Sequence, residues 1–325
     1  MELQFTLESF DSLFNEWATL QSKSPNSHIF STPDWSKVWW QHFGDGSTLY
    51  LGAIKKAGNI IGIAPLRMKD STAFFIGDAS VCDYLDFIIK PGEEPDFFSV
   101  LLDNLTAAGA RQLHLSPVRG DSSVITSLAA IAQHRRLTFQ RTNHDVSLDV
   151  SLPTSWEEYL QLLTSKQRHE LNRKWRRLQE MGEVSFRTST DGNSHDITTF
   201  IKLFRESRQD KAKFLTPPME LFFSSLLSTM AKAQRLRLNL LEVNTVPVAA
   251  TICLDYQDVV YLYNSGYDPQ FSWLSVGLIS KAMSIQDSIH RGKKRFDFLK
   301  GGEQYKYHLG GQEIPLFACS LSLIQ

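Results

Sequence analysis

The chain has 325 residues, of which 42% are hydrophobic and 21% charged, and its formal net charge is -1. This length fits two domains of about 150 residues each, and the balanced charge gives no overall attraction to nucleic acid or to an anionic membrane. No apolar run reaches the length of about 18 residues that predicts a membrane-spanning helix, and the first residues lack the pattern of a signal peptide. We therefore expect a cytoplasmic protein with no membrane span.

In chain order, the first half alternates strands and helices, which predicts an α/β or α+β unit. Thr32 or Asp34 can cap a helix whose first turn holds Pro33, and Gly58 allows a tight turn between two strands. The predicted helical segments are Leu7–Gln21, Phe30–His42 (a loop that enters a helix), Asp96–Ala108 and Ser123–His134. The predicted strands are Thr48–Lys55, Ile60–Leu66, Phe74–Ile76, Tyr84–Ile89, Gln112–Leu115, Thr138–Arg141 and Val146–Leu152.

Pro153 opens the second half, so we predict domains 1–152 and 153–325. Ser155 suits an N-cap, and one long helix is expected over Tyr159–Met181, with Gly182 after its end. Further predicted helices are Ser194–Arg208, Pro217–Ala233 and about Ser275–His290. The predicted strands are Val184–Thr188, Leu236–Val243, Val248–Leu254, Val259–Tyr263 and Arg295–Leu299.

Three cysteines, Cys82, Cys253 and Cys319, are widely separated, and the last two lie in apolar stretches. An odd number at this spacing fits buried, reduced thiols better than a disulfide framework or a metal site. We therefore predict no metal.

The long helix after Pro153 contains a nearly all-basic cluster over residues 165–182. Helical spacing places Lys166, Arg173 and Arg177 on one side, opposite an apolar stripe. A charge run is often only a solvated helix face. The same three side chains can converge on one anion, and we interpret them as a candidate phosphate site.

The order strand, strand, loop, helix, strand over residues 246–311 resembles the second half of a GNAT-type acyltransferase core. The resemblance implies a donor strand with small residues and a helix N-terminus that receives the donor's pyrophosphate. The strand residues are Ala249, Ala250 and Thr251, and the residues at the helix start are Ser272, Trp273, Ser275 and Gly277. The usual glycine-rich phosphate loop of GNAT enzymes is absent, and Ser275 could equally be a simple N-cap.

The closing segment DFLKGGEQYKY supplies the candidate catalytic residues. Asp297 alternates with two phenylalanines on a short strand, so its carboxylate could be a base or a buried ion-pair partner. Lys306 follows a Gly-Gly turn between Tyr305 and Tyr307, where an ammonium suits oxyanion stabilisation or phosphate binding. A surface lysine with its stem on apolar groups is the alternative.

Several blocks along the chain together resemble the CelD/BcsL-like acetyltransferases, a GNAT branch related to the Fem peptidyltransferases. The blocks, which run from about residue 28 to 311, are FSTPDW with WWQHFG, IGIAPL, the basic helix from Ser165 to Gly182, and DFLKGGEQYK. The segment 305–310 loosely matches a closing Fem block in which lysine follows an aromatic residue, with Leu309 in place of the second aromatic residue.

This resemblance implies two GNAT-like domains, each a mixed, mostly antiparallel sheet flanked by helices. It also implies transfer of an acyl group to an amine or hydroxyl of a sugar-like or envelope-precursor acceptor. The preferred acyl group is acetyl, and its donor is acetyl-CoA. In Fem relatives the lysine assists transfer from aminoacyl-tRNA, so tRNA is a second possible partner. Three functions stay open: a CoA-dependent acyltransferase, an aminoacyl-tRNA-dependent transferase, and a non-catalytic binding protein.

Two residues in the first half are candidate acceptor contacts. Trp39 belongs to a dense aromatic group that could stack a sugar ring, although such groups more often form a core. Asp86 lies on a predicted short strand and could bind acceptor hydroxyls.

Overall fold

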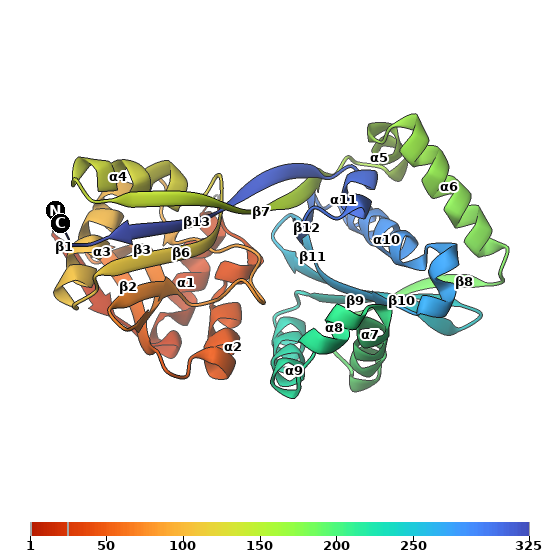
Figure 1. Ribbon diagram of the computed structural model, residues 1–325, viewed down its shortest axis with the longest axis horizontal. Coiled ribbons are helices and arrows are strands. Elements are labelled where there is room, and N and C mark those ends of the chain that lie inside the picture. Colours follow the sequence, from red (N-terminus) through yellow and green to blue (C-terminus); the bar gives the residue numbers. More distant parts are fainter. Residues whose placement is uncertain (1, 25, 325) are drawn as a thin grey trace. The chain divides into compact units, whose positions relative to one another are not determined.

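The computed structural model describes residues 2–24 and 26–324 (Figure 1). It divides into two compact units, residues 1–146 with 314–325, and residues 147–313. Each unit contains sheet and helices, which confirms the predicted mixed α/β class. The domain boundary after residue 152 stays a prediction. The grouping differs from it in two respects, because the division falls after residue 146 and because the last strand pairs with the first unit.

The first unit is a mixed sheet with strand order β1-β2-β3-β4-β6-β13, and β5 pairs with β3. Its strands are β1 (Leu3–Leu7), β2 (Thr48–Lys56), β3 (Asn59–Lys69), β4 (Thr72–Phe75), β5 (Ile88–Ile89), β6 (Gln112–Arg119) and β13 (Gln312–Ser322). Its helices are α1 (Phe10–Lys23), α2 (Pro33–Phe43), α3 (Glu94–Ala107) and α4 (Ala129–His134), with helical turns η1 (Ile29–Ser31) and η2 (Val124–Leu128).

Local sequence signals in the first unit are mostly confirmed. The Thr32 hydroxyl accepts a hydrogen bond from Trp35 N and caps α2, with Pro33 in the first turn. Strand β1 was not predicted, and only the end of Tyr84–Ile89 is a strand. The two strands expected between 138 and 152 are one long strand, β7 (Phe139–Ser151), which passes from the first unit into the second.

The second unit is a sheet in the order β7-β12-β11-β10-β9-β8 with helices on both faces (Figure 1). Its further strands are β8 (Val184–Ser189), β9 (Leu236–Val243), β10 (Val246–Tyr256), β11 (Val259–Tyr267) and β12 (Arg295–Lys300). Its helices are α5 (Trp156–Leu162), α6 (Ser165–Gln179), α7 (Ser194–Ser207), α8 (Gln209–Phe214), α9 (Pro217–Lys232), α10 (Val276–His290) and α11 (Gln304–His308), with the turn η3 (Pro269–Leu274).

Strands β11 and β12 form the parallel pair of this sheet, and they soon part. Val259–Tyr261 pair with Arg295–Asp297. Beyond Tyr261, β11 continues to Tyr267 while pairing with β10. No strand in the described part of the chain pairs with the other edge of β11 there, so the backbone on this edge is left outside the sheet's hydrogen bonding.

The long helix expected over Tyr159–Met181 is in fact two helices, α5 and α6, separated at Leu163 and Thr164. The Thr164 hydroxyl accepts from Gln167 N, and the Gln167 side chain accepts from Thr164 N. This capping box starts a new helix, and the backbone of Thr164 is extended rather than helical.

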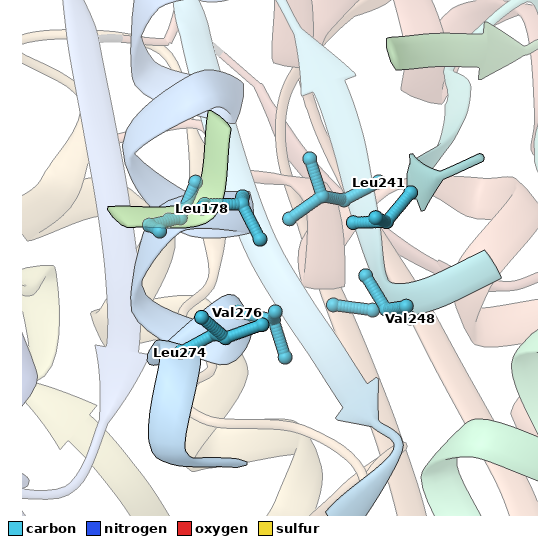
Figure 2. Packing of buried hydrophobic residues seen from close by; sticks show 8 residues of the cluster. Leu178, Leu241, Val248, Leu274 and Val276 are labelled. Carbon is cyan, nitrogen blue, oxygen red and sulfur yellow. The ribbon is translucent and has the colours of Figure 1, made fainter. Parts of the chain in front are cut away.

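A buried apolar cluster fixes α6 against the start of α10. Leu178 of α6 converges with Leu241 and Val248 of the sheet and with Leu274 and Val276 at the α10 N-terminus (Figure 2). All five side chains are buried. Because burial of such side chains is worth about 1.5–3 kcal/mol each, the basic face of α6 is held in a fixed position beside this helix start.

Among residues 2–24 and 26–324, no helix is both long and apolar enough to cross a membrane.

Candidate functional site

Positive charge gathers at the N-terminus of α10. Lys174 of α6 donates from Nζ to Ser275 Oγ over 2.9 Å, and the Arg177 guanidinium lies 4.7 Å from the centre of the Trp273 ring. No side chain in the described chain caps α10, and Ser275 at its start has a left-handed φ of 59°. The helix dipole and two cations therefore favour an anion at this place.

A pocket of about 480 Å³ lies beside this helix start, between α6, α10 and α11. Lys166 and Lys174 contribute positive charge to it, and Leu278 contributes an apolar wall. Its complete lining is Thr164, Lys166, Gln167, Glu170, Leu171, Lys174, Leu278, His308 and Leu309. The pocket is large enough for part of a nucleotide-sized ligand.

The basic residues of α6 do not act as one group. Arg173 makes a two-pronged salt bridge to Glu170, with both N–O distances at 2.8 Å. That contact lowers the pKa of the Glu170 carboxyl to about 2. The geometry therefore brings Lys166 and Arg177 to the region of the pocket and the helix start, whereas Arg173 is already paired. Lys174 contacts Ser275 directly, and its Nζ also lies 3.4 Å from Glu170 Oε1, so Glu170 is shared by Arg173 and Lys174.

The helix-start residues differ in what they contact. Trp273 and Ser275 meet α6 as described, and the Ser272 carbonyl accepts from Ser275 N at 2.9 Å. A Cβ on Gly277 would lie 3.1 Å from the Tyr267 ring, so the glycine allows close packing of helix and strand.

Strand β10 does not have the open edge that its predicted donor-binding role requires. Ala249, Ala250 and Thr251 pair with β9 on one side and β11 on the other. Their side chains are buried, and Thr251 Oγ1 bonds to Ser284 Oγ at 2.9 Å. This corrects the geometry of the predicted site, because the strand with an unpaired edge is β11.

Lys306 is buried and holds the end of β12. Only 2% of the residue is exposed, and Nζ donates to the carbonyls of Leu299, Lys300 and Gly301 at 2.9, 2.6 and 2.9 Å. Nζ also lies 2.9 Å from Glu303 Oε2. An ammonium has three protons, so these contacts give Lys306 a positioning role. Its predicted direct contact with substrate stays a prediction.

Asp297 supports the same turn from the other side. Its Oδ1 accepts from Leu299 N at 2.7 Å and from Ser147 Oγ at 3.4 Å. The β12–β7 pairing has a bulge between Asp297 and Leu299, and Leu299 has a φ of 65°, which a branched side chain rarely adopts. Two charged side chains therefore stabilise a strained backbone. Tyr305, the third predicted catalytic residue, lies with its ring 4.6 Å from Lys281 Nζ.

Trp39 and Asp86 both form hydrogen bonds to other residues of the first unit. Trp39 is buried, and its Nε1 donates to Asp78 Oδ2 at 3.0 Å. Asp86 accepts from Ser123 N, Ser123 Oγ and Phe87 N. Burial raises the pKa of Asp86 to about 6 against these hydrogen bonds. Their predicted acceptor contacts stay predictions without support from this geometry.

Within residues 2–24 and 26–324, no three histidine, cysteine, aspartate or glutamate side chains are grouped so as to hold a metal ion.

Residues 165–307 match the family model described as Acetyltransferase (GNAT) domain. No curated protein sequence matches the chain. Its fold is similar to that of FemX, with a TM-score of 0.68, 10% identity and coverage of 97% of this chain and 96% of FemX. It is also similar to the C-terminal domain (DUF2156) of a putative lysylphosphatidylglycerol synthetase from Agrobacterium fabrum, with a TM-score of 0.60, 9% identity and coverage of 96% and 92%.

A third similar structure is a tandem GNAT protein from the clavulanic acid biosynthesis pathway, with a TM-score of 0.55, 11% identity and coverage of 100% of this chain and 99% of that one. The fold of this protein is therefore GNAT-like, as the sequence predicted. Residues 165–307, the part of the chain that matches the GNAT acetyltransferase model, include the α10 helix start and β11.

Proposed function

We propose that the second unit is an acyltransferase that moves an acetyl group from acetyl-CoA to an amine or hydroxyl of a small sugar-like or envelope-precursor acceptor. The observation that carries this proposal is the α10 N-terminus, where Lys174 and Arg177 add two cations to the helix dipole beside a pocket. A pyrophosphate fits this combination of charge and free N–H groups. Relationship to the CelD/BcsL-like branch is part of the proposal.

Two features of the second unit would take part in the transfer: the α10 N-terminus and the edge of β11 that no described strand pairs with. With the phosphates at α10, the pantetheine arm would lie along the edge of β11 beyond Tyr261, where backbone groups outside strand pairing can bond its amides. The Ser265 carbonyl of β11 already accepts from Lys211. The acceptor's amine or hydroxyl then attacks the thioester carbonyl, the C–S bond breaks, and CoA leaves as thiolate while the acceptor loses a proton. Fixing donor and acceptor in one geometry is itself a large part of catalysis in such transfers.

Acetyl-CoA binding by calorimetry tests this proposal, with free CoA as the comparison. We expect micromolar binding that weakens about tenfold in Lys174→Met and in Arg177→Met, since each removes one charge from the phosphate site. Arg173→Met is the matched control on the same helix, because Arg173 is paired with Glu170. No binding by the wild-type chain, or equal losses in all three variants, would count against the site.

Aminoacyl-tRNA is the second candidate donor, favoured by the fold similarity to FemX. In that case the chain would bind tRNA rather than acetyl-CoA, and the affinity would fall steeply as salt rises. Titrations with deacylated tRNA at two salt concentrations separate the two donors.

A further inference from the structure

Two lysines of the second unit are buried to different degrees near the point where β11 and β12 part. Lys281, on α10, is 6% exposed, and its Nζ donates to the Gly277 carbonyl at 2.8 Å. Lys211, on α8, is partly buried and donates to the Ser265 carbonyl of β11. Ser265 lies beyond Tyr261, the last residue of β11 that pairs with β12.

Aromatic rings form part of the surroundings of both ammonium groups. Lys281 Nζ lies 4.6 Å from the centre of the Tyr305 ring, and Lys211 Nζ lies 4.9 Å from that of Phe204. A ring face attracts a cation but accepts no conventional hydrogen bond. Each ammonium has three protons, and in the described chain each has one carbonyl acceptor. Both groups therefore retain donors for a ligand.

The surrounding charges do not neutralise this pair. Lys281 interacts electrostatically with Lys211 on α8, with Glu303 and Lys306 around α11, and with Cys253 on β10. Lys211 interacts with Arg208, with Asp210 and with the same Glu303. The Glu303 carboxylate is already bonded to Lys306, and Asp210 is bonded to Arg208. Two positive charges are thus left without a carboxylate of their own.

Leaving a buried ammonium unpaired is costly, and the protein reduces this cost by releasing protons. Burial, with a smaller effect of neighbouring Lys211, lowers the pKa of Lys281 to about 7. Burial also lowers the pKa of Lys211 to about 8. An anion bound by both ammonium groups would raise both pKa values again, so that binding would draw protons from the solvent.

We propose that Lys211 and Lys281 form an oxyanion-binding site that receives a carboxylate or phosphate group of the acceptor. That the ligand is the acceptor rests on the proposed transferase function, whereas the oxyanion site itself rests on the contacts alone. The site lies where the sheet opens, with Lys211 bonded to β11 and Lys306 bonded to the end of β12. The acceptor would therefore be an acidic small molecule.

Calorimetric titration of the full chain, without any acyl donor, tests the site. The probes are acetate for a carboxylate, inorganic phosphate for a phosphate, and acetamide as the neutral comparison. We expect saturable binding of at least one anion and none of acetamide. At pH 8, heats measured in two buffers of different ionisation enthalpy should show net proton uptake, and affinity should fall as the pH rises from 7 to 9. If neither acetate nor phosphate binds, or if binding occurs without proton uptake, the inference is overturned.

Variants then locate the ion. We expect Lys281→Met and Lys211→Met to weaken anion binding at least tenfold, and Lys213→Met, on the exposed side of α8, to leave it unchanged. If phosphate binding survives in Lys281→Met but is lost in Lys174→Met, the ion binds at the α10 N-terminus and the inference is wrong.

Two features keep this test decisive. The proton-uptake measurement uses only the wild-type chain, so it stands even where a variant fails to fold. It also omits the donor, so it separates the two proposals. Anion binding at Lys281 together with no acetyl-CoA binding would retain the oxyanion site and overturn the CoA-dependent function, and the reverse result would do the opposite.

Discussion

Lys306 donates to three successive backbone carbonyls at the end of β12, and these contacts stabilise the turn that follows the strand. The sequence predicts Lys306 as a catalytic residue. Its contacts lead to a different expectation. The Leu299 backbone is strained, and Lys306 and Asp297 are the charged groups that hold it in place.

We expect Lys306→Ala to lower the free energy of unfolding by about 3 kcal/mol or more, because buried carbonyls lose their donors together. Urea denaturation measures this loss. Lys294→Ala, an exposed lysine shortly before β12, is the control and should change stability little. An unaltered unfolding midpoint in Lys306→Ala would show that the turn does not depend on the lysine.

Protonation of Lys281 gives a second prediction for a single side chain. Its folded-state pKa is about 7 and its ordinary value is 10.5, so between these values the unfolded chain binds more protons. Stability should therefore rise as pH increases from 7 toward 10. The Lys281→Met variant should lack this part of the rise, which unfolding curves at pH 7, 8.5 and 10 would reveal. Parallel pH profiles for the two proteins would contradict it.

Among the elements, α6 shows how a cap decides which charges face a site. The capping box at Thr164 starts the helix, and Gln167 also donates to the Tyr307 carbonyl, which ties α6 to α11. The helix start thus fixes the rotation that sends Lys174 to Ser275 and leaves Arg173 with Glu170.

Thr164→Ala removes the side-chain cap of α6, and we expect it to destabilise the protein by about 1 kcal/mol. Thermal or urea unfolding gives the comparison. Thr198→Ala, at an exposed position inside α7, should be neutral or slightly stabilising, since alanine favours a helix interior. Equal effects of the two substitutions would mean that the box contributes nothing.

At the scale of the whole molecule, the three cysteines are free and buried, as the sequence predicted. Burial raises the pKa of Cys253 to about 12 and also raises that of Cys82 and Cys319. The thiolate is the reactive form, so a thiol reagent should react slowly with the folded protein and with three groups after denaturation. Rapid reaction of the native protein would show that a thiol is accessible.

Local signals predicted most of the fold, because helix caps and strand patterns act between near neighbours. Thr32 and Pro33 mark the start of α2 in this way. The site depends on distant partners. Arg173 and Lys174 are adjacent in a basic run, and only the packing of α6 shows which one reaches Ser275. Lys281 lies among mostly apolar residues in the first half of α10, which is a signal that the sequence offers, but the nearby Lys211 comes from another helix.

The same dependence on distant partners explains why the sequence indicates β10, and not β11, as the donor strand. Small residues made Ala249 and Ala250 attractive candidates, yet an open edge is a property of strand order. Only the early separation of β11 from β12 shows where that edge lies.

The return of β13 to the first unit has a consequence for protein synthesis. Leu316–Ser322 pair with β6, so this sheet is built from the beginning and the end of the chain. The first 146 residues leave the ribosome before this strand has been made. Until the strand arrives, β6 lacks one neighbour and is an unprotected edge that invites pairing with other chains.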